Sequence, residues 1–249
     1  MKKLLLLCVL WPSLASAQIV FDTSTDGGLG NPVTSITWAH TTTGTDRMLA
    51  VCVFGDVTND VITGVTYAGN ALTLVDKALA QASGRWGYLY YMIAPTSGAN
   101  NIIVSASSSI AIYGMASSYT GVHQTTPLDA SNTGTDIGLS SSQTVSVTTT
   151  VDNDWTVMCT RVETGGSVPT AGAGTTLRQS VSAGLVLSDS NGALTPVGSK
   201  SLIINDTDSA NWASIIAAFS PATGGGGGAT PCHRSLLGVG CDLSLWARR

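Results

Sequence analysis

The sequence predicts an all-β protein: an antiparallel, jelly-roll-like β-sandwich with a Gly-linked C-terminal tail. Between residues 19 and 222, runs rich in Val, Ile, Thr and Tyr alternate with clusters of Gly, Asn, Asp, Ser and Pro, a pattern typical of strands and turns. The runs recur roughly every 8 to 12 residues, which leaves no room for the helices that connect parallel strands. No stretch has a convincing helical period.

Thirteen runs of the chain are predicted to be strands. They are 35–40, 48–54, 61–67, 71–75, 86–93, 101–106, 111–120, 143–149, 155–162, 176–182, 185–190, 199–204 and 212–219. The run 143–149 alternates in polarity, as a half-buried strand does, whereas 48–54 is apolar throughout and is predicted to be central and covered on both faces. The run 212–219 resembles a short helix, but its β-branched residues favour a closing strand. This number of strands is larger than that of an immunoglobulin-type domain, so a jelly roll is the favoured topology.

The start of the chain predicts export. A basic beginning (Lys2 and Lys3), an apolar stretch over 4–14 and an Ala-Ser-Ala cleavage sequence indicate that residues 1–17 are a signal peptide. No later segment approaches the roughly 18 uninterrupted apolar residues of a membrane span. The protein is therefore predicted to be secreted or held at an extracellular surface.

The remaining chain divides by composition. Residues 18–222 are predicted to form the β-sandwich domain, 223–228 a Gly-rich linker, and 229–249 a short Cys-containing tail. The domain is acidic. The tail is basic, and it contains Leu and Trp residues that are predicted to be exposed. Two interpretations of the tail stay open: a disordered terminus, or a peptide that docks on a partner surface.

Four cysteines follow the signal peptide, and an oxidising compartment favours disulfides among them. Cys232 and Cys241 would close a short local loop, and Cys52 and Cys159 each lie in the middle of a predicted strand. For the second pair, a disulfide and two buried thiols are equally compatible with the sequence.

The sequence argues against catalysis and nucleic-acid binding. The chain has 11 basic and 15 acidic residues, so it lacks the basic clusters that hold nucleic acid. No hydrolase, zinc-protease or nucleotide-binding motif is present. His40 and His123 are predicted to have ordinary surface or hydrogen-bonded roles, and Glu163 with a neighbouring Asp is a weak case for the paired carboxylates of a glycosidase. An enzyme would become the better hypothesis if His123 or Glu163 faced an acidic pocket.

Acidic segments are candidate metal sites. Asp206, Asp208 and Asn211 offer several oxygen ligands within a few residues, and Asp22 with Asp26 is the second choice. Ca²⁺ prefers such oxygen-rich, flexible loops, so a structural Ca²⁺ is the candidate cofactor. The alternative is that these residues make local hydrogen bonds in turns.

Trp86, Tyr88 and Tyr90 are the candidate ligand-binding residues. Their spacing places all three on one face of a strand, with Tyr91 on the other. Such a row is either part of a sandwich core or an exposed platform on which sugar rings stack.

Several stretches resemble a known module. They are 36–41 followed by 47–51, then 65–73, 94–98 and 118–128. Together they are similar to a recurrent β-sandwich module of uncharacterised secreted bacterial and phage-associated proteins, over roughly Val33 to Pro221. The resemblance implies a fold and an extracellular setting but no activity. Such modules often carry Asp or Asn where this chain has His123, which argues against an ion site there.

These observations predict a secreted, non-enzymatic module for adhesion or glycan binding, whose partner is a glycan or another cell-surface component. The alternative is a structural subunit of an extracellular filament, sheath or virion. In that case the short apolar strand Gln18 to Phe21 would add to the sheet edge of a neighbouring copy, and the C-terminal tail would assist self-association.

Overall fold

The computed structural model describes residues 18–80, 84–163, 167–181 and 184–223. Its strands are β1 (Val20–Thr42), β2 (Met48–Asp56), β3 (Ile62–Tyr67), β4 (Asn70–Ala71), β5 (Thr73–Ala80), β6 (Arg85–Ile93), β7 (Gly98–Thr120), β8 (Leu128–Thr149), β9 (Trp155–Val162), β10 (Thr170–Ala171), β11 (Thr176–Ser180), β12 (Leu185–Asp189) and β13 (Gly198–Phe219). The predicted all-β class is confirmed. The described residues contain no helix long and apolar enough to span a bilayer. The predicted signal peptide and the tail with Cys232 and Cys241 lie outside these residues.

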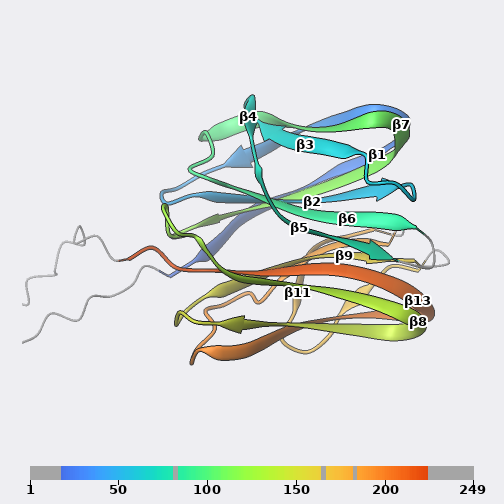
Figure 1. Ribbon diagram of the computed structural model, residues 1–249. Coiled ribbons are helices and arrows are strands. Elements are labelled where there is room, and N and C mark those ends of the chain that lie inside the picture. The colour runs from blue at the N-terminus through green and yellow to red at the C-terminus, as the bar shows by residue number, and fades with distance from the viewer. Residues whose placement is uncertain (1–17, 81–83, 164–166, 182–183, 224–249) are drawn as a thin grey trace, which may run out of the picture.

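Two antiparallel sheets stack on each other (Figure 1). The first has the strand order β4-β3-β7-β2-β6-β5, with β1 paired to β7; the second has the order β10-β13-β9-β12-β11, with β8 paired to β13. The antiparallel sandwich is thus as predicted. Its topology has one feature that a jelly roll lacks: each sheet is built from consecutive strands of one half of the chain.

Four strands are far longer than the sequence indicates. β1, β7, β8 and β13 have 22 or 23 residues each. The runs 101–106 and 111–120, predicted to be separate, are the two parts of β7, and 199–204 and 212–219 are the two parts of β13. Small polar residues between the parts resemble a turn in sequence. In the structure they continue the strand through shifts in register, as between Asn205 and Ala210, which bend the sheet.

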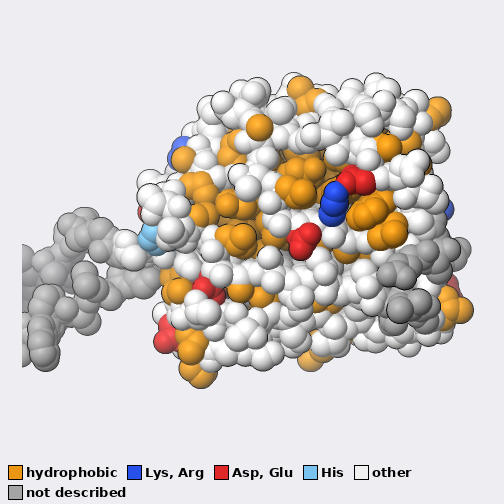
Figure 2. Space-filling view, viewed as in Figure 1, with side chains coloured by type: hydrophobic (Ala, Val, Ile, Leu, Met, Phe, Trp, Pro, Cys, Tyr) orange, Lys and Arg blue, Asp and Glu red, His pale blue; other side chains and the backbone are white. Residues whose placement is uncertain are grey.

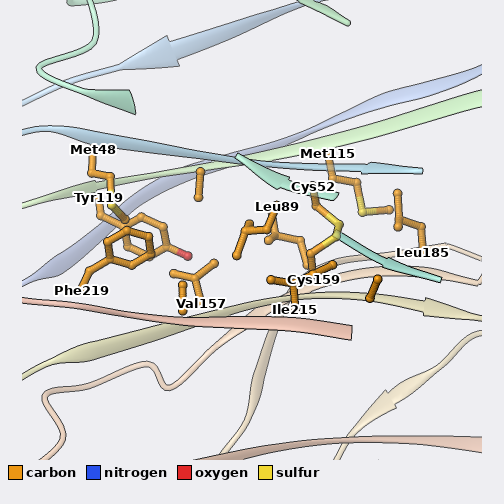
Figure 3. Close-up of a cluster of buried hydrophobic side chains, with 14 of the residues drawn as sticks. Met48, Cys52, Leu89, Met115, Tyr119, Val157, Cys159, Leu185, Ile215 and Phe219 are labelled. Atoms are coloured by element: carbon orange, nitrogen blue, oxygen red, sulfur yellow. A yellow bond between two sulfur atoms is a disulfide. The ribbon is translucent and has the colours of Figure 1, made fainter. Parts of the chain in front are cut away.

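The bends fold each sheet over itself, so side chains are buried in three clusters. The first lies between the two sheets and includes Met48, Leu89, Met115, Val157, Leu185 and Ile215 (Figure 3). The second lies inside the fold of the first sheet and includes Trp38, Val51, Tyr67, Tyr88, Tyr90, Ile102 and Ile112. The third lies inside the fold of the second sheet and includes Val145, Met158, Leu202, Ile204 and Trp212.

A disulfide joins Cys52 and Cys159 within the first cluster (Figure 3). Their Cα atoms are 5.3 Å apart, and the two residues are 107 positions apart in the chain. Both are fully buried. The disulfide interpretation of this pair is therefore the right one, and the bond links the two sheets covalently.

The two halves of the chain repeat one structure with this same spacing. In the first half, the carboxylate of Asp22 accepts hydrogen bonds from the backbone N–H (2.9 Å) and the hydroxyl (2.6 Å) of Thr43. In the second half, Asp129 accepts the same two bonds from Thr150. Asp129 and Thr150 each follow their counterpart by the 107 positions that separate the two cysteines.

Strand pairing extends the repeat to both sheets. β7 pairs with β1 and β2 as β13 pairs with β8 and β9, and β6 pairs with β5 as β12 pairs with β11. Gly27 lies so close to Trp38 that an added Cβ would be 2.5 Å from its ring, and Gly134 has the same relation to Val145 at 2.6 Å. Glycine therefore serves the same bend in both halves, although the residue that it faces has changed.

The N-terminal segment belongs to the molecule's own sheet. Val20 pairs with Thr120 and Phe21 with Tyr119 at the start of β1, and Ile19 is buried in the first cluster. The segment Gln18 to Phe21 is therefore not free, contrary to the structural-subunit hypothesis. Exchanging it for the corresponding strand of a neighbouring copy would break its pairing with β7.

Candidate binding groove

β6 carries the predicted aromatic row on a single face. The ring centroids of Trp86 and Tyr88 are 6.3 Å apart, and those of Tyr88 and Tyr90 are 6.4 Å apart, with interplanar angles of 29° and 25°. Tyr91 lies on the opposite face, where its ring is 5.6 Å from that of Phe219. The alternation along β6 is therefore as the sequence predicts.

The row is not an open stacking platform. Tyr88 and Tyr90 are only 2% and 5% exposed and pack in the second cluster, and Trp86 is partly buried against it. The reason is the bend in β1 and β7, which carries β3 over this face of the sheet. The hypothesis of an exposed platform of three rings, on which sugars stack, is therefore wrong, because the two tyrosines are buried.

A groove of about 540 Å³ opens beside Tyr90, at the edge of the layer that covers the row. Its lining comes from the edge of β3, from the β4–β5 segment, and from one residue each of β6 and β7: Ile62, Thr63, Gly64, Val65, Thr66, Ala71, Leu72, Leu74, Tyr90 and Ser105. Figure 2 shows hydrophobic side chains gathered on this side of the molecule. None of the lining residues carries a charged side chain.

The lining combines apolar and hydroxyl groups. Leu72 and Val65 are buried and belong to the second cluster, whereas Leu74 is 40% exposed. Burial, and then the charge of Asp60, raise the pKa of Tyr90 to about 12. The Tyr90 phenol therefore keeps its proton at neutral pH and can donate a hydrogen bond.

Two opposite charges lie beside the aromatic row. Asp60 pairs with Lys77 and accepts a 2.7 Å hydrogen bond from the Tyr88 hydroxyl. Lys77 also lies 5.5 Å from the centroid of the Trp86 ring, a cation–π contact. Burial alone would raise the pKa of Asp60, but the hydrogen bonds from Lys77 and Tyr88 outweigh it and lower the pKa. Asp60 and Lys77 thus offset each other's charge next to the aromatic row.

The second half of the chain shows what the fold itself requires at these positions. In the first half, Tyr88 pairs with Val53 and Tyr90 pairs with Val51. The residues 107 positions after these two valines are Thr160 and Met158. They pair with Val186 and Ser188. The counterparts of the two tyrosines are therefore valine and serine. Gly55, which lies opposite Trp86 in the first half, corresponds to Val162 in the second. The backbone N–H of Val162 donates to the carbonyl of Gly184, so a glycine stands at the position equivalent to Trp86. The same strand pairing therefore forms without aromatic residues at these three positions.

The predicted Ca²⁺ ligands lie inside strands, not in loops. Asp22 accepts from Thr43 and from the Ser118 hydroxyl (2.8 Å), and Asp26 accepts from the backbone of Gly28 (2.8 Å). Both acidic residues belong to β1, so their oxygens serve the fold's own contacts.

Asp206, Asp208 and Asn211 lie in β13 where it bends. Asp206 accepts from the Ser167 hydroxyl (2.5 Å) and from the backbone N–H of Asp208 (2.9 Å). Across the described residues, no three His, Cys, Asp or Glu side chains gather so as to hold a metal ion.

The two histidines of the domain differ. His40 is buried. Burial lowers its pKa to about 4, although the negative charge of Asp22 acts to raise it. His123 lines one hollow with Asp46 and another, of about 310 Å³, with Asp129. Its Nδ1 accepts from the backbone N–H of Thr126 (3.0 Å). The hydroxyls of Thr125 (3.4 Å) and Thr126 (3.3 Å) lie within hydrogen-bond distance of the same nitrogen, so the ring is held by groups of its own loop.

Glu163 is held in ion pairs with Arg85 (2.9 Å) and Arg161 (3.2 Å). The remaining carboxylate candidate for acid–base chemistry is thus tied to two cations. Stable pairing of this kind is a structural role for the one glutamate of the chain.

The chain matches no protein-family model, no curated protein and no solved structure. The resemblance to secreted β-sandwich modules stays a prediction.

Proposed function

We propose that this protein is a secreted, non-catalytic module that binds a neutral glycan at an extracellular surface through the groove beside Tyr90. One observation carries the proposal: the groove is lined only by apolar and uncharged hydroxyl side chains. It lies against a row of aromatic residues that the equivalent strand of the second half does without. The export-type beginning of the sequence and the Cys52–Cys159 disulfide support an oxidising, extracellular location.

The chemistry of a neutral sugar suits this lining. A pyranose ring has apolar C–H faces, which Leu72, Leu74 and the ring of Tyr90 can contact. Its hydroxyls can exchange hydrogen bonds with Thr63, Thr66 and Ser105. An anionic sugar would lose its hydration without gaining a cation, because Lys77 is already paired with Asp60.

A glycan array probed with the mature chain tests the proposal. We expect neutral glycans to be retained in preference to anionic ones. Leu74→Ala and Tyr90→Ser should abolish retention; serine is the residue that β12 carries at the position of Tyr90. Leu139→Ala is the matched control, because Leu139 is an exposed leucine of the second half. Retention that survives both groove variants, or that prefers anionic glycans, would refute the proposal.

Light scattering on the same samples separates the rival function. A structural subunit would form polymers whose mass grows with protein concentration, with no retention on the array. A glycan-binding module stays a stable monomer, with or without residues 223–249.

A further inference from the structure

The groove adjoins a surface on the outside of the folded-over layer, here called the outer face. Its residues are the solvent-facing ones of three neighbouring strands: Ser35, Thr37, Ala39 and Thr41 of β1, Ala99, Asn101, Ile103 and Ser105 of β7, and Gly64 and Thr66 of β3. Ile103 pairs with Thr37 on one side and with Thr66 on the other. The three strands are therefore in direct register.

The outer face contains no charged side chain. The segments 31–42, 61–75 and 98–110 that build it include no Lys, Arg, Asp or Glu. Their one histidine, His40, is buried, with a pKa of about 4. In the centre Ile103 is 37% exposed, so an apolar side chain is flanked by hydroxyl groups on both sides.

Groove and outer face share residues. Thr66 and Ser105 line the groove and also belong to the outer face. At about 3.3 Å per residue and about 4.8 Å between strands, the face extends about 20 Å along β1 and about 10 Å across the three strands. A ligand that leaves the groove therefore meets a further neutral surface longer than one sugar ring.

We infer that groove and outer face form one extended site that binds several consecutive units of a linear, neutral polysaccharide. The inference rests on the proposed function and adds the class of ligand. One unit contacts Leu74 and Tyr90 in the groove, and the following units lie across Ile103 and its flanking hydroxyls. A charged polymer is excluded, since each acidic or basic group would be desolvated without an opposite charge.

The second half supplies a matched control surface. The counterparts of Thr37, Ala39 and Thr41 are Thr144, Ser146 and Thr148, each 107 positions later. Ser146 and Ser201 share a hydrogen bond of 2.8 Å, and Ile203 pairs with Thr144 as Ile103 pairs with Thr37. This face is also uncharged at these positions, but its half carries valine and serine in place of Tyr88 and Tyr90.

Affinity electrophoresis of the mature chain in gels containing soluble glucan, mannan, galactan or xylan is the test. Calorimetry with three-unit and six-unit fragments of the retarding polymer follows. We expect the six-unit fragment to bind at least about tenfold more tightly, as linked contacts add. Thr37→Lys should remove that gain, whereas Leu74→Ala should abolish binding of both fragments. Thr144→Lys, at the equivalent exposed position, should change neither.

Each contrary result has its own meaning. Equal affinity for both fragments, or a Thr37→Lys variant that keeps the gain, overturns the extended site while groove binding stands, provided that Leu74→Ala still abolishes it. If no polymer retards the chain, the proposed function fails and the extended site with it. Concentration-dependent self-association that both lysine variants suppress overturns the inference in favour of stacking between copies through the two faces.

Discussion

Cys52 and Cys159 occupy equivalent positions in the two halves of the chain, and their disulfide joins the two sheets at the centre of the layer between them. The bond closes a loop of 107 residues. In the chain-entropy account, a loop of about 100 residues is worth about 4 to 5 kcal/mol.

Replacing both cysteines with alanine should therefore lower the free energy of unfolding by about 4 kcal/mol, measured by urea unfolding. Wild-type protein under reducing conditions should lose a similar amount. The far-ultraviolet circular dichroism should stay that of an all-β protein, because strand pairing does not depend on the bond. A double variant as stable as the oxidised wild type would contradict this expectation.

Asp154 predicts a pH dependence of stability. Burial, followed by the hydrogen bond and the charge of Asp129, raises the pKa of Asp154 to about 7. The folded state thus binds this proton more tightly than the unfolded chain, where an Asp pKa is about 3.9. The free energy of unfolding should therefore fall as the pH rises from about 4 to about 7.

Asp154→Asn should flatten that part of the profile and exceed wild-type stability above pH 7 by about 2 to 4 kcal/mol. Urea unfolding at a series of pH values from acid to mild alkali measures it. Asp152→Asn is the control, because Asp152 is an exposed carboxyl of the same turn. Profiles of Asp154→Asn and wild type that run parallel through this range would disprove the assignment.

The contact between Gly27 and Trp38 predicts the cost of an added methyl group. A Cβ at position 27 would lie 2.5 Å from the Trp38 ring, so Gly27→Ala should lower the free energy of unfolding by about 1 to 3 kcal/mol through overpacking. Gly192→Ala is the control, since nothing lies within 4 Å of its Cβ position. Thermal unfolding compares the two, and equal melting temperatures would show that the ring moves aside freely.

Glycan binding should be independent of pH between about 5 and 9, because no residue that lines the groove titrates there. Tyr90, with a pKa of about 12, keeps its proton throughout. Calorimetry at several pH values measures this. An affinity that changes with pH in this range would contradict the assignment of the groove as the binding site.

The sequence predicts the fold class and most strand centres because alternation of period two is a local property. It also places Trp86, Tyr88 and Tyr90 on one face, as the structure has them. It does not predict which layer covers that face. The covering strand β3 reaches it through the bends in β1 and β7, and these bends depend on pairing between distant segments.

The repeat escapes sequence reasoning for a different reason. Equivalent residues keep their backbone roles while their side chains change in character. The backbone carbonyl of Arg47 accepts from Ala94 as that of Asp154 accepts from Leu194, yet one side chain is a cation and the other an acid. The groove, too, depends on contacts between β3 and the β4–β5 segment that only the assembled sheet brings together.

Because each sheet comes from consecutive strands of one half, the chain has the organisation of a fused homodimer. Two identical copies of such a half would stack in the same way, and each cysteine would meet its own counterpart on the symmetry axis. Within the single chain the two halves need not be identical: the first carries Tyr88 and Tyr90 where the second carries the smaller Val186 and Ser188.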